Sequence, residues 1–467
     1  MLFLKKLSFF IKRALQRLLG AFPAYHKYYI NYLMKEKFIE NYDFLNKSQW
    51  FSAEKIASYQ QEKLSEMIRY SYKNVPYYKD LFDREGIDPG EIRTVEDLRK
   101  IPIVDKYKVR DQPEDFRASG YEQFNPKTNK TSGSTGTPFK ILVDQAVVSF
   151  VHAVIWRHYN WAGCRFHDKS VYMGPPFDYE TGEIDLKNLY QLDSTGKILK
   201  LNTGLMNKET LPELCRLLED FKPDHIHAYP SIISIFAQYL LKNKSYEIRP
   251  ESVILRAEKV YPEHRDLVKS AFGCPCFELY AMYEYITFAS ECDHHSLHLN
   301  EEMGITEIIK DGKPCAPGEV GEIVGTTLLN HSMPLIRYAM GDYGRIKKET
   351  CACGRQSPIL EVTGSRAKDL IVTEKGYFNV MSGVPLIIEG VNEGINHVQF
   401  YQKDMKNLII RLVKKDKAVN LDESQIKKRV GNYFRNSINI SIEYVDSIAR
   451  TKSGKYKYVD SEVPLEI

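Results

Sequence analysis

The sequence predicts an α/β protein with a large, multi-sheet N-terminal domain and a small α+β C-terminal domain. Short β-rich runs alternate with helical patterns from about residue 130 to residue 345, which is typical of βαβ units around a parallel sheet. Roughly the last hundred residues differ, because two strands around a polar turn precede a helix and a further strand. A chain of 467 residues can bury a large core without disulfides.

The elements are expected in the following order. Residues 25–115 are mainly helical and polar, with loops at 74–76 and 101–102. The alternating part has strands at 170–173, 225–228 and 253–257 and helices at 211–221 and 232–241. In the C-terminal domain we predict strands at 370–372, 397–401, 408–413 and 440–445 and an amphipathic helix at 423–438.

The N-terminal segment has the pattern of a basic amphipathic helix over residues 1–20, with lysines and arginines mostly off its apolar stripe. It is not a signal peptide, because charges interrupt the apolar stretch. Two alternatives stay open: residues 1–19 contact an anionic membrane surface, or the helix docks on the core. We therefore expect a helix at 1–20, an N-terminal domain at 21–368 and a C-terminal domain at 369–467.

The charge balance is mild, since 65 lysines and arginines against 61 aspartates and glutamates give a net charge of +4. This does not indicate a nucleic-acid-binding protein. No apolar run reaches the roughly 18 residues of a spanning helix. The eight cysteines suit a reducing compartment, so we expect a cytoplasmic protein, peripheral at the inner face of the membrane if the N-terminal helix binds lipid.

The most informative motif is a loop rich in serine, threonine and glycine between Lys130 and Lys140. Glycines allow tight turns that present backbone N–H groups to an anion, and hydroxyls add donors, so the loop suits phosphate oxygens. It is neither a Walker loop nor a dinucleotide fingerprint. The alternative is a flexible polar loop. Its candidate ligand-binding residues are Thr131, Ser132, Gly133, Ser134, Thr135 and Gly136.

This loop resembles the phosphate loop of the adenylate-forming enzymes, the superfamily of acyl-coenzyme A synthetases and luciferases. Further segments resemble its phenylacetate-coenzyme A ligase family in the same order: 74–78, 101–103, 257–258, 280–284, 337–342, 365–369 and 453–455. Residues 284–292, EYITFASEC, look most like the branch of capsular polysaccharide biosynthesis proteins of the CapK type.

The resemblance implies a ligase that uses ATP and Mg²⁺ to activate a carboxylic acid as an acyl-adenylate. Glu284 would bind Mg²⁺, and Asp342 would accept the ribose hydroxyls. Lys455 would bridge the attacking and α-phosphate oxygens as a point charge. The remaining nucleotide contacts implied are the loop Thr131–Gly136, Glu258 at the adenine side, the segment with Tyr280, Ala281 and Tyr283, and Arg366.

Each assignment has a structural alternative. Glu284 could begin a helix, Asp342 could lie in a turn before Gly344, and Lys455 could be a solvated lysine. Two residues also depart from the family pattern, because Ala281 replaces the usual glycine and Tyr283 the usual threonine or serine. A phenol is larger and reaches farther than a small hydroxyl, which indicates an unusual acyl pocket or weakened activity.

A second motif indicates a structural zinc site. Cys351 and Cys353 form a C-x-C pair, and Cys292 with His298 completes a Cys₃His set of the kind that Zn²⁺ takes. Some relatives in the resembled family have similar positions and carry zinc. The alternative is that the cysteines are reduced and simply packed.

Three functions remain open at this stage. The first is transfer of the acyl group to coenzyme A, with rotation of a mobile C-terminal domain between the two half-reactions. The second is transfer to an amine or hydroxyl of a surface polysaccharide precursor without coenzyme A. The third is a non-catalytic nucleotide-binding component of a polysaccharide assembly complex. The expected partners are a carboxylic acid and either coenzyme A or such a precursor, and no nucleic acid.

Overall fold

The computed structural model describes residues 37–131, 139–174, 188–193, 195–206, 209–364, 370–380, 394–414, 421–434, 436–448 and 459–463. The helix predicted at 1–20 lies outside these residues. The described chain begins with helical segments, as expected from the polar helical pattern: α3 (Phe38–Ser48), α4 (Ala53–Asn74), α5 (Pro76–Glu85), η1 (Asp97–Lys100), α6 (Lys106–Asp111) and η2 (Tyr121–Phe124). Ser52 caps α4 by accepting a hydrogen bond from the Lys55 amide.

An eight-stranded sheet forms the centre of the N-terminal part, with the order β10-β9-β8-β7-β6-β3-β5-β4. Its strands β5, β3, β6, β7 and β8 run parallel, whereas β4, β9 and β10 pair antiparallel with their neighbours. The strands span Ser170–Gly174 (β3), Tyr190–Leu192 (β4), Ile198–Asn202 (β5), His225–Ala228 (β6), Ser252–Arg256 (β7), Cys276–Tyr280 (β8), Ala289–Glu291 (β9) and Leu297–Leu299 (β10). The predicted βαβ sheet is confirmed here.

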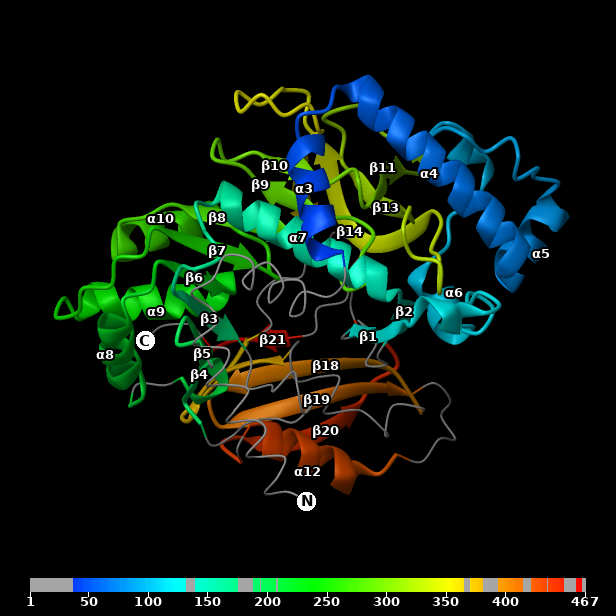
Figure 1. Cartoon of the computed structure of the whole chain (residues 1–467). Helices are drawn as coiled ribbons and strands as arrows, with labels where there is room; N and C mark the ends of the chain where they lie inside the picture. Colours follow the sequence, from blue (N-terminus) through cyan, green and yellow to red (C-terminus); the bar gives the residue numbers. More distant parts are fainter. Residues whose placement is uncertain are drawn as a thin grey trace, which may run out of the picture.

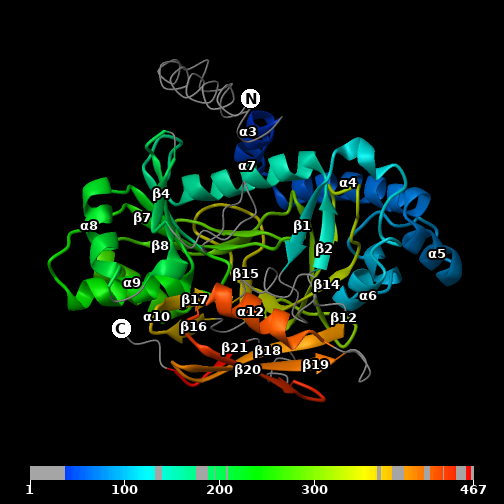
Figure 2. The same ribbon diagram turned by 90° about the horizontal axis from the view of Figure 1, so that it is seen from below.

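Helices cover both faces of this sheet (Figures 1 and 2). On one face α8 (Leu211–Phe221), α9 (Pro230–Lys242) and α10 (Pro262–Phe272) bury a large apolar core, which includes Val253 and Leu255 of β7. On the other face α7 (Gln145–Trp161) packs through Tyr159 against Ile254. The short 3₁₀ turn η3 (Thr203–Leu205) follows β5.

A second sheet corrects the expectation of βαβ alternation as far as residue 345. Between residues 289 and 364 the chain forms strands without intervening helices. A five-stranded antiparallel sheet has the order β12-β11-β13-β14-β15 and consists of Gly304–Lys310 (β11), Lys313–Pro314 (β12), Gly321–Thr327 (β13), Tyr338–Ile346 (β14) and Leu360–Gly364 (β15). Antiparallel strands need only short connections, so helices are not required there.

The serine- and glycine-rich loop connects a β-hairpin. Strands β1 (Lys127–Thr131) and β2 (Phe139–Val143) pair antiparallel, and Thr131 lies opposite Phe139 at the open end of the ladder. Residues 132–138, which include the predicted phosphate ligands Ser132 to Gly136, lie outside the described residues.

The C-terminal part has its own sheet and core (orange and red in Figure 1). The sheet order is β20-β19-β18-β21, and a separate hairpin joins β16 (Leu370–Thr373) to β17 (Gly376–Asn379). Its elements are β18 (Ile395–Asp404), β19 (Asn407–Lys414), α12 (Glu423–Tyr433), β20 (Asn439–Tyr444) and β21 (Val459–Ser461). The predicted helix 423–438 was too long, since α12 ends at Tyr433 before Asn436 with its positive φ of 51°. Among the described helices, none combines the length and apolarity that a membrane span requires.

Candidate nucleotide site and cysteine–histidine cluster

Tyr280 and Asp342 join the two sheets of the N-terminal part. Tyr280 is the last residue of β8, and its hydroxyl donates a hydrogen bond to Oδ2 of Asp342 in β14 at 2.9 Å. Burial raises the pKa of Tyr280 well above its usual value, and the negative charges of Asp342 and Glu284 add to this. Both carboxylates therefore lie near the same neutral phenol, at the carboxyl end of a parallel strand.

Glu284 is buried, with 6% of its surface exposed. Its Oε1 accepts a hydrogen bond from the hydroxyl of Tyr338 at 3.1 Å and lies 3.8 Å from Nζ of Lys106. The segment 281–285 is a loop and turn, so the alternative that Glu284 begins a helix was wrong. The ammonium of Lys106 supplies positive charge to this buried carboxylate, whose oxygen atoms are also of the hard type that Mg²⁺ takes.

The alternative that Asp342 is a turn residue was also wrong. It lies inside the nine-residue strand β14, not in a turn before Gly344. The preceding Arg337 adopts a positive φ of 49°, and its buried guanidinium forms an ion pair with Glu307 and donates to the carbonyl of Ile101. This arrangement fixes the start of the strand that carries both Tyr338 and Asp342.

The β1–β2 hairpin is attached to the loop that carries Glu284. The side-chain amide of Asn129 donates to the backbone carbonyl of Tyr283 at 2.9 Å. Tyr283 itself is 55% exposed, and Ala281 is exposed beside it. The hairpin that frames the serine- and glycine-rich loop thus lies next to the carboxylate predicted to bind metal.

Glu258 follows β7 at the same edge of the eight-stranded sheet. Its carboxylate accepts hydrogen bonds from the amide and the hydroxyl of Ser231, at 2.9 and 2.8 Å, in the first turn of α9. The preceding Ala257 has a φ of 68°, a conformation that a non-glycine residue adopts only when its surroundings hold it there. Glu258 therefore fixes the connection between a strand end and a helix start.

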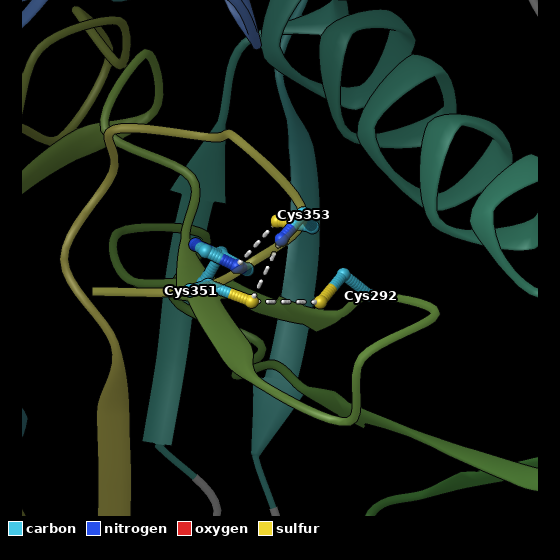
Figure 3. Close-up of side chains that lie close together, drawn as sticks. Cys292, Cys351 and Cys353 are labelled. Atoms are coloured by element: carbon cyan, nitrogen blue, oxygen red, sulfur yellow. Dashed lines mark hydrogen bonds between the residues drawn. The ribbon is translucent and has the colours of Figure 1, made fainter. Parts of the chain in front are cut away.

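The four predicted metal ligands come together in space, and Figure 3 shows the side chains of Cys292, Cys351 and Cys353 among them. One ligand atom from each of Cys292, His298, Cys351 and Cys353 lies within 4.8 Å of the others. The sulfur atoms of Cys292 and Cys351 are 3.6 Å apart, and the sulfur of Cys353 is 3.3 Å from Nε2 of His298. Cys292 and His298 lie more than 50 residues before Cys351 and Cys353 in the sequence. In the fold the four side chains nevertheless form a compact Cys₃His set.

The surroundings of His298 orient it as a ligand. Its Nδ1 donates to the carbonyl of Ser357 at 3.0 Å, which leaves Nε2 facing Cys353. Burial lowers the pKa of His298, so its imidazole is neutral at neutral pH. Burial also raises the pKa of Cys292 to about 12, so an ion bound there has to displace the thiol proton.

Comparisons with known proteins agree with this architecture. Residues 370–462 match the model of the CapK C-terminal domain family. The chain is 26% identical over 391 residues to a phenylacetate-coenzyme A ligase of Thermus thermophilus, covering 82% of this chain and 83% of the relative. It is 24% identical over 419 residues to the protein CapK of Staphylococcus aureus, covering 86% and 89%.

Solved structures share the fold. A 2-hydroxyisobutyryl-CoA ligase in complex with 2-HIB-AMP and CoA in the thioesterification state aligns with a TM-score of 0.57 at 18% identity, covering 89% of this chain and 92% of that chain. The same ligase in its postadenylation state, with R3-HIB-AMP, aligns with a TM-score of 0.56 at 16% identity, covering 89% and 92%. The chain is thus similar over most of its length to phenylacetate-coenzyme A ligases and to CapK, matches the CapK C-terminal domain family at residues 370–462, and shares the fold of an acyl-CoA ligase.

The structure places two residues beside Glu284 that the sequence did not single out, Lys106 and Tyr338. Lys106 lies beside Glu284, and its only sequence signal is the segment Ile101–Lys106, whose first residues resemble the family. The hydrogen bond from Tyr338 to Glu284 has no such signal, because 54 residues separate the two. The predicted nucleotide contact Arg366 and the predicted catalytic Lys455 lie outside the described residues.

Proposed function

We propose that this protein activates a carboxylic acid with ATP as an acyl-adenylate and transfers the acyl group to coenzyme A. The observation that carries the proposal is the convergence of Tyr280, Asp342 and Glu284 where β8 and β14 meet. Relatives named as phenylacetate-coenzyme A ligases support the same chemistry. The carboxylate of the acid would attack the α-phosphate of ATP, and pyrophosphate would leave.

Each residue of the site has a proposed role in binding the nucleotide. Asp342 accepts the ribose hydroxyls, and Tyr280 holds its carboxylate in place through their hydrogen bond. The loop Thr131–Gly136 holds the β- and γ-phosphates. Glu284 fits Mg²⁺, because it is a buried carboxylate next to the hairpin that frames this loop. The ion would supply positive charge to the phosphate oxygens.

Lys455 and Arg366 are proposed as the remaining charged contacts. Lys455 neutralises the charge that develops on the α-phosphate oxygens, and catalysis comes mainly from such positioning and electrostatics. We place Lys455 in a mobile domain at 369–467, so that rotation near Lys368 and Asp369 removes it before the thiol attacks.

An isotope-exchange assay tests the proposal. Acid-dependent exchange between ATP and pyrophosphate is measured across a panel of carboxylic acids, and thioester formation is then measured with coenzyme A. Lys455→Ala should abolish exchange while ATP binding persists, and Lys457→Ala is the matched control that should keep it. Unchanged exchange in Lys455→Ala would show that another residue is the catalytic lysine.

A second candidate concerns only the acyl acceptor. The resemblance of residues 284–292 to the CapK-type capsular polysaccharide biosynthesis proteins suggests an amine or hydroxyl on a surface polysaccharide precursor as the acceptor in place of coenzyme A. In that case exchange proceeds normally but no thioester forms with coenzyme A. Absence of exchange with every acid would favour a non-catalytic, nucleotide-binding role.

We further propose that Cys292, His298, Cys351 and Cys353 hold a structural Zn²⁺. The donor set fits, because three sulfur atoms and one neutral imidazole nitrogen converge within bonding reach of a common centre. The ion would tie the segment at Cys351 to the strands β9 and β10. Elemental analysis of purified protein should give one zinc per chain, and Cys351→Ser should lose it, whereas Cys215→Ser, a buried core cysteine, should not.

The protein is proposed to be cytoplasmic, with residues 1–19 contacting the inner face of the membrane. A basic amphipathic helix binds anionic lipid through its charges and its apolar stripe. Cosedimentation with vesicles of phosphatidylglycerol and phosphatidylcholine should depend on residues 1–19 and weaken at high salt. Equal binding after their deletion would contradict this.

A further inference from the structure

The hairpin β1–β2 and the loop that carries Glu284 rest on the same apolar core. Ile141 and Val143 of β2 are buried in it, and Ile286 and Phe288, which follow the loop, belong to the same cluster. Apolar packing is non-directional, so it brings the two segments together without fixing where the Glu284 carboxylate lies.

Strand β1 needs more than this packing, because it carries no apolar side chain. Its sequence is KTNKT, and it pairs with β2 in a two-stranded sheet. A two-stranded hairpin is at best marginally stable by itself in water. A hydrogen bond from β1 to a neighbouring segment therefore helps to determine where the hairpin and that segment lie relative to each other.

Asn129, in the middle of β1, supplies such a hydrogen bond. Its side-chain amide donates to the backbone carbonyl of Tyr283 at 2.9 Å. Burial raises the pKa of Tyr285, and a hydrogen bond with the Asn129 side chain opposes that shift. One side chain of β1 thus contacts the residues immediately before and after Glu284.

The turn at Glu284 has a backbone that needs support. The amide of Tyr285 donates to the carbonyl of Met282 at 3.2 Å, and Tyr285 has a positive φ of 55°. A bulky residue keeps such a conformation only where its surroundings hold it. The side chain of Glu284 is held separately, since its Oε1 accepts the hydrogen bond from Tyr338. Asn129 therefore supports the backbone of a residue whose carboxylate is tied to β14.

We propose that Asn129 is a positioning residue, which holds the Glu284 carboxylate where a Mg²⁺ ion can join it to the phosphates of the nucleotide. The inference rests on the proposed function and deepens it, because it assigns a role to a side chain outside the residues expected to contact ATP. The acceptor is a main-chain carbonyl, so the hydrogen bond does not depend on the tyrosine side chain of Tyr283. In this role Asn129 acts through Glu284 and is not itself a ligand of the ion.

The sign of the effect follows from the charges. Without a divalent ion, the Glu284 carboxylate and the phosphates are both negative and repel each other. With the ion bound, the same proximity is favourable, because Mg²⁺ takes oxygen ligands from carboxylates and from phosphates. Loss of the Asn129 hydrogen bond should therefore weaken nucleotide binding when Mg²⁺ is present and not when it is absent.

Calorimetry of nucleotide binding tests this independently of turnover. The affinity for α,β-methylene-ATP, whose α–β bridge does not release pyrophosphate, is measured with excess Mg²⁺ and with a chelator instead. AMP is the control ligand, because it lacks the β- and γ-phosphates. Asn129→Leu removes the donor at nearly unchanged size, and Asn129→Ala removes the bulk as well. Thr128→Val is the matched control, since Thr128 is the exposed neighbour on the opposite face of the same strand.

The quantity to compare is the ratio of the affinities for the analogue with and without Mg²⁺. Thr128→Val should keep the wild-type ratio. In Asn129→Leu and Asn129→Ala the ratio should fall by about 3- to 10-fold, the range expected for the loss of one hydrogen bond. The affinity for AMP should stay at the wild-type value, and circular dichroism should show that both variants are folded.

An unchanged ratio in both Asn129 variants overturns the inference and leaves the proposed function intact. A fall in Asn129→Ala alone, an equal fall in Thr128→Val, or an equal loss of affinity for AMP also overturns it, since each would indicate a general effect of the hairpin. If wild type binds the nucleotide but no acid supports exchange between ATP and pyrophosphate, the proposed function fails and the affinity ratios still decide the inference. A wild-type affinity that does not rise with Mg²⁺ overturns the inference whatever the exchange assay gives.

Discussion

Arg157 and Glu302 form an ion pair in the interior of the protein, with Nη1 and Oε1 2.7 Å apart and side chains 2% and 4% exposed. The pair links α7 to the segment before β11, and Arg157 also donates to Asn300 and to the carbonyl of Leu45. Burial raises the pKa of Glu302, but the charge and hydrogen bonds of Arg157 outweigh this and hold it below its usual value.

Removal of one partner should be strongly destabilising. Arg157→Met leaves an uncompensated buried carboxylate, so the free energy of unfolding should fall by about 3–5 kcal/mol. Urea denaturation followed by circular dichroism measures this. The double variant Arg157→Met/Glu302→Gln should recover part of the loss, and a control that replaces the exposed Arg84 should change little. A double variant no better than the single one would refute the pairing.

Glu301 predicts an unusual pH dependence of stability. Burial and the neighbouring charge of Glu302 raise its pKa to about 8, from a usual value of 4.5. Between these values the folded state holds a proton that the unfolded state has released, so this group makes stability fall as pH rises. Glu301→Gln should therefore raise the melting temperature more at pH 8 than at pH 5. An equal effect at both pH values would contradict the shift.

Tyr280→Phe tests the positioning of Asp342. Loss of the 2.9 Å hydrogen bond should lower kcat/KM for ATP by about 10- to 150-fold, because hydrogen bonds to charged groups contribute about 1.5–3 kcal/mol. Tyr72→Phe is a matched control, since Tyr72 donates to Asp83 at 2.8 Å on the surface. Steady-state kinetics of acid-dependent exchange measures both. Equal effects in the two variants would argue against a role for Tyr280.

The proposed zinc ion should stabilise the ends of helices α3 and α7, which contact Arg355 beside the C-x-C pair. Arg355 follows the C-x-C pair, lies 3.9 Å from the Trp161 ring centroid and 4.8 Å from that of Trp50, and donates to Oε1 of Gln49 at 3.0 Å. Removal of the ion by a chelator should lower the melting temperature and increase hydrogen exchange around Trp50. Arg355→Met should increase exchange there while zinc stays bound. Unchanged exchange after metal loss would separate the site from the helices.

The parallel sheet was predictable because β-rich and helical patterns alternate, and the strand at 225–228 was placed correctly. The Cys₃His set was predictable from residue types, the C-x-C spacing and the resemblance to zinc-carrying relatives, and the structure brings the four side chains together. The antiparallel sheet was missed, because its strands follow one another without a helical pattern between them. The contact of Lys106 with Glu284 was missed because no local pattern links residues that only folding brings together.

The division between the two sheets has a consequence for evolution. Asp342 and Tyr338 belong to the antiparallel sheet, whereas Arg256, Tyr172 and His227 belong to the parallel sheet. Substitutions in β3, β6 and β7 can therefore change the ends of the parallel strands while β14, the strand that we propose faces the nucleotide, keeps its sequence. Such modularity would let one scaffold diversify its substrates by a few strand-end replacements, with Tyr280 preserving the junction.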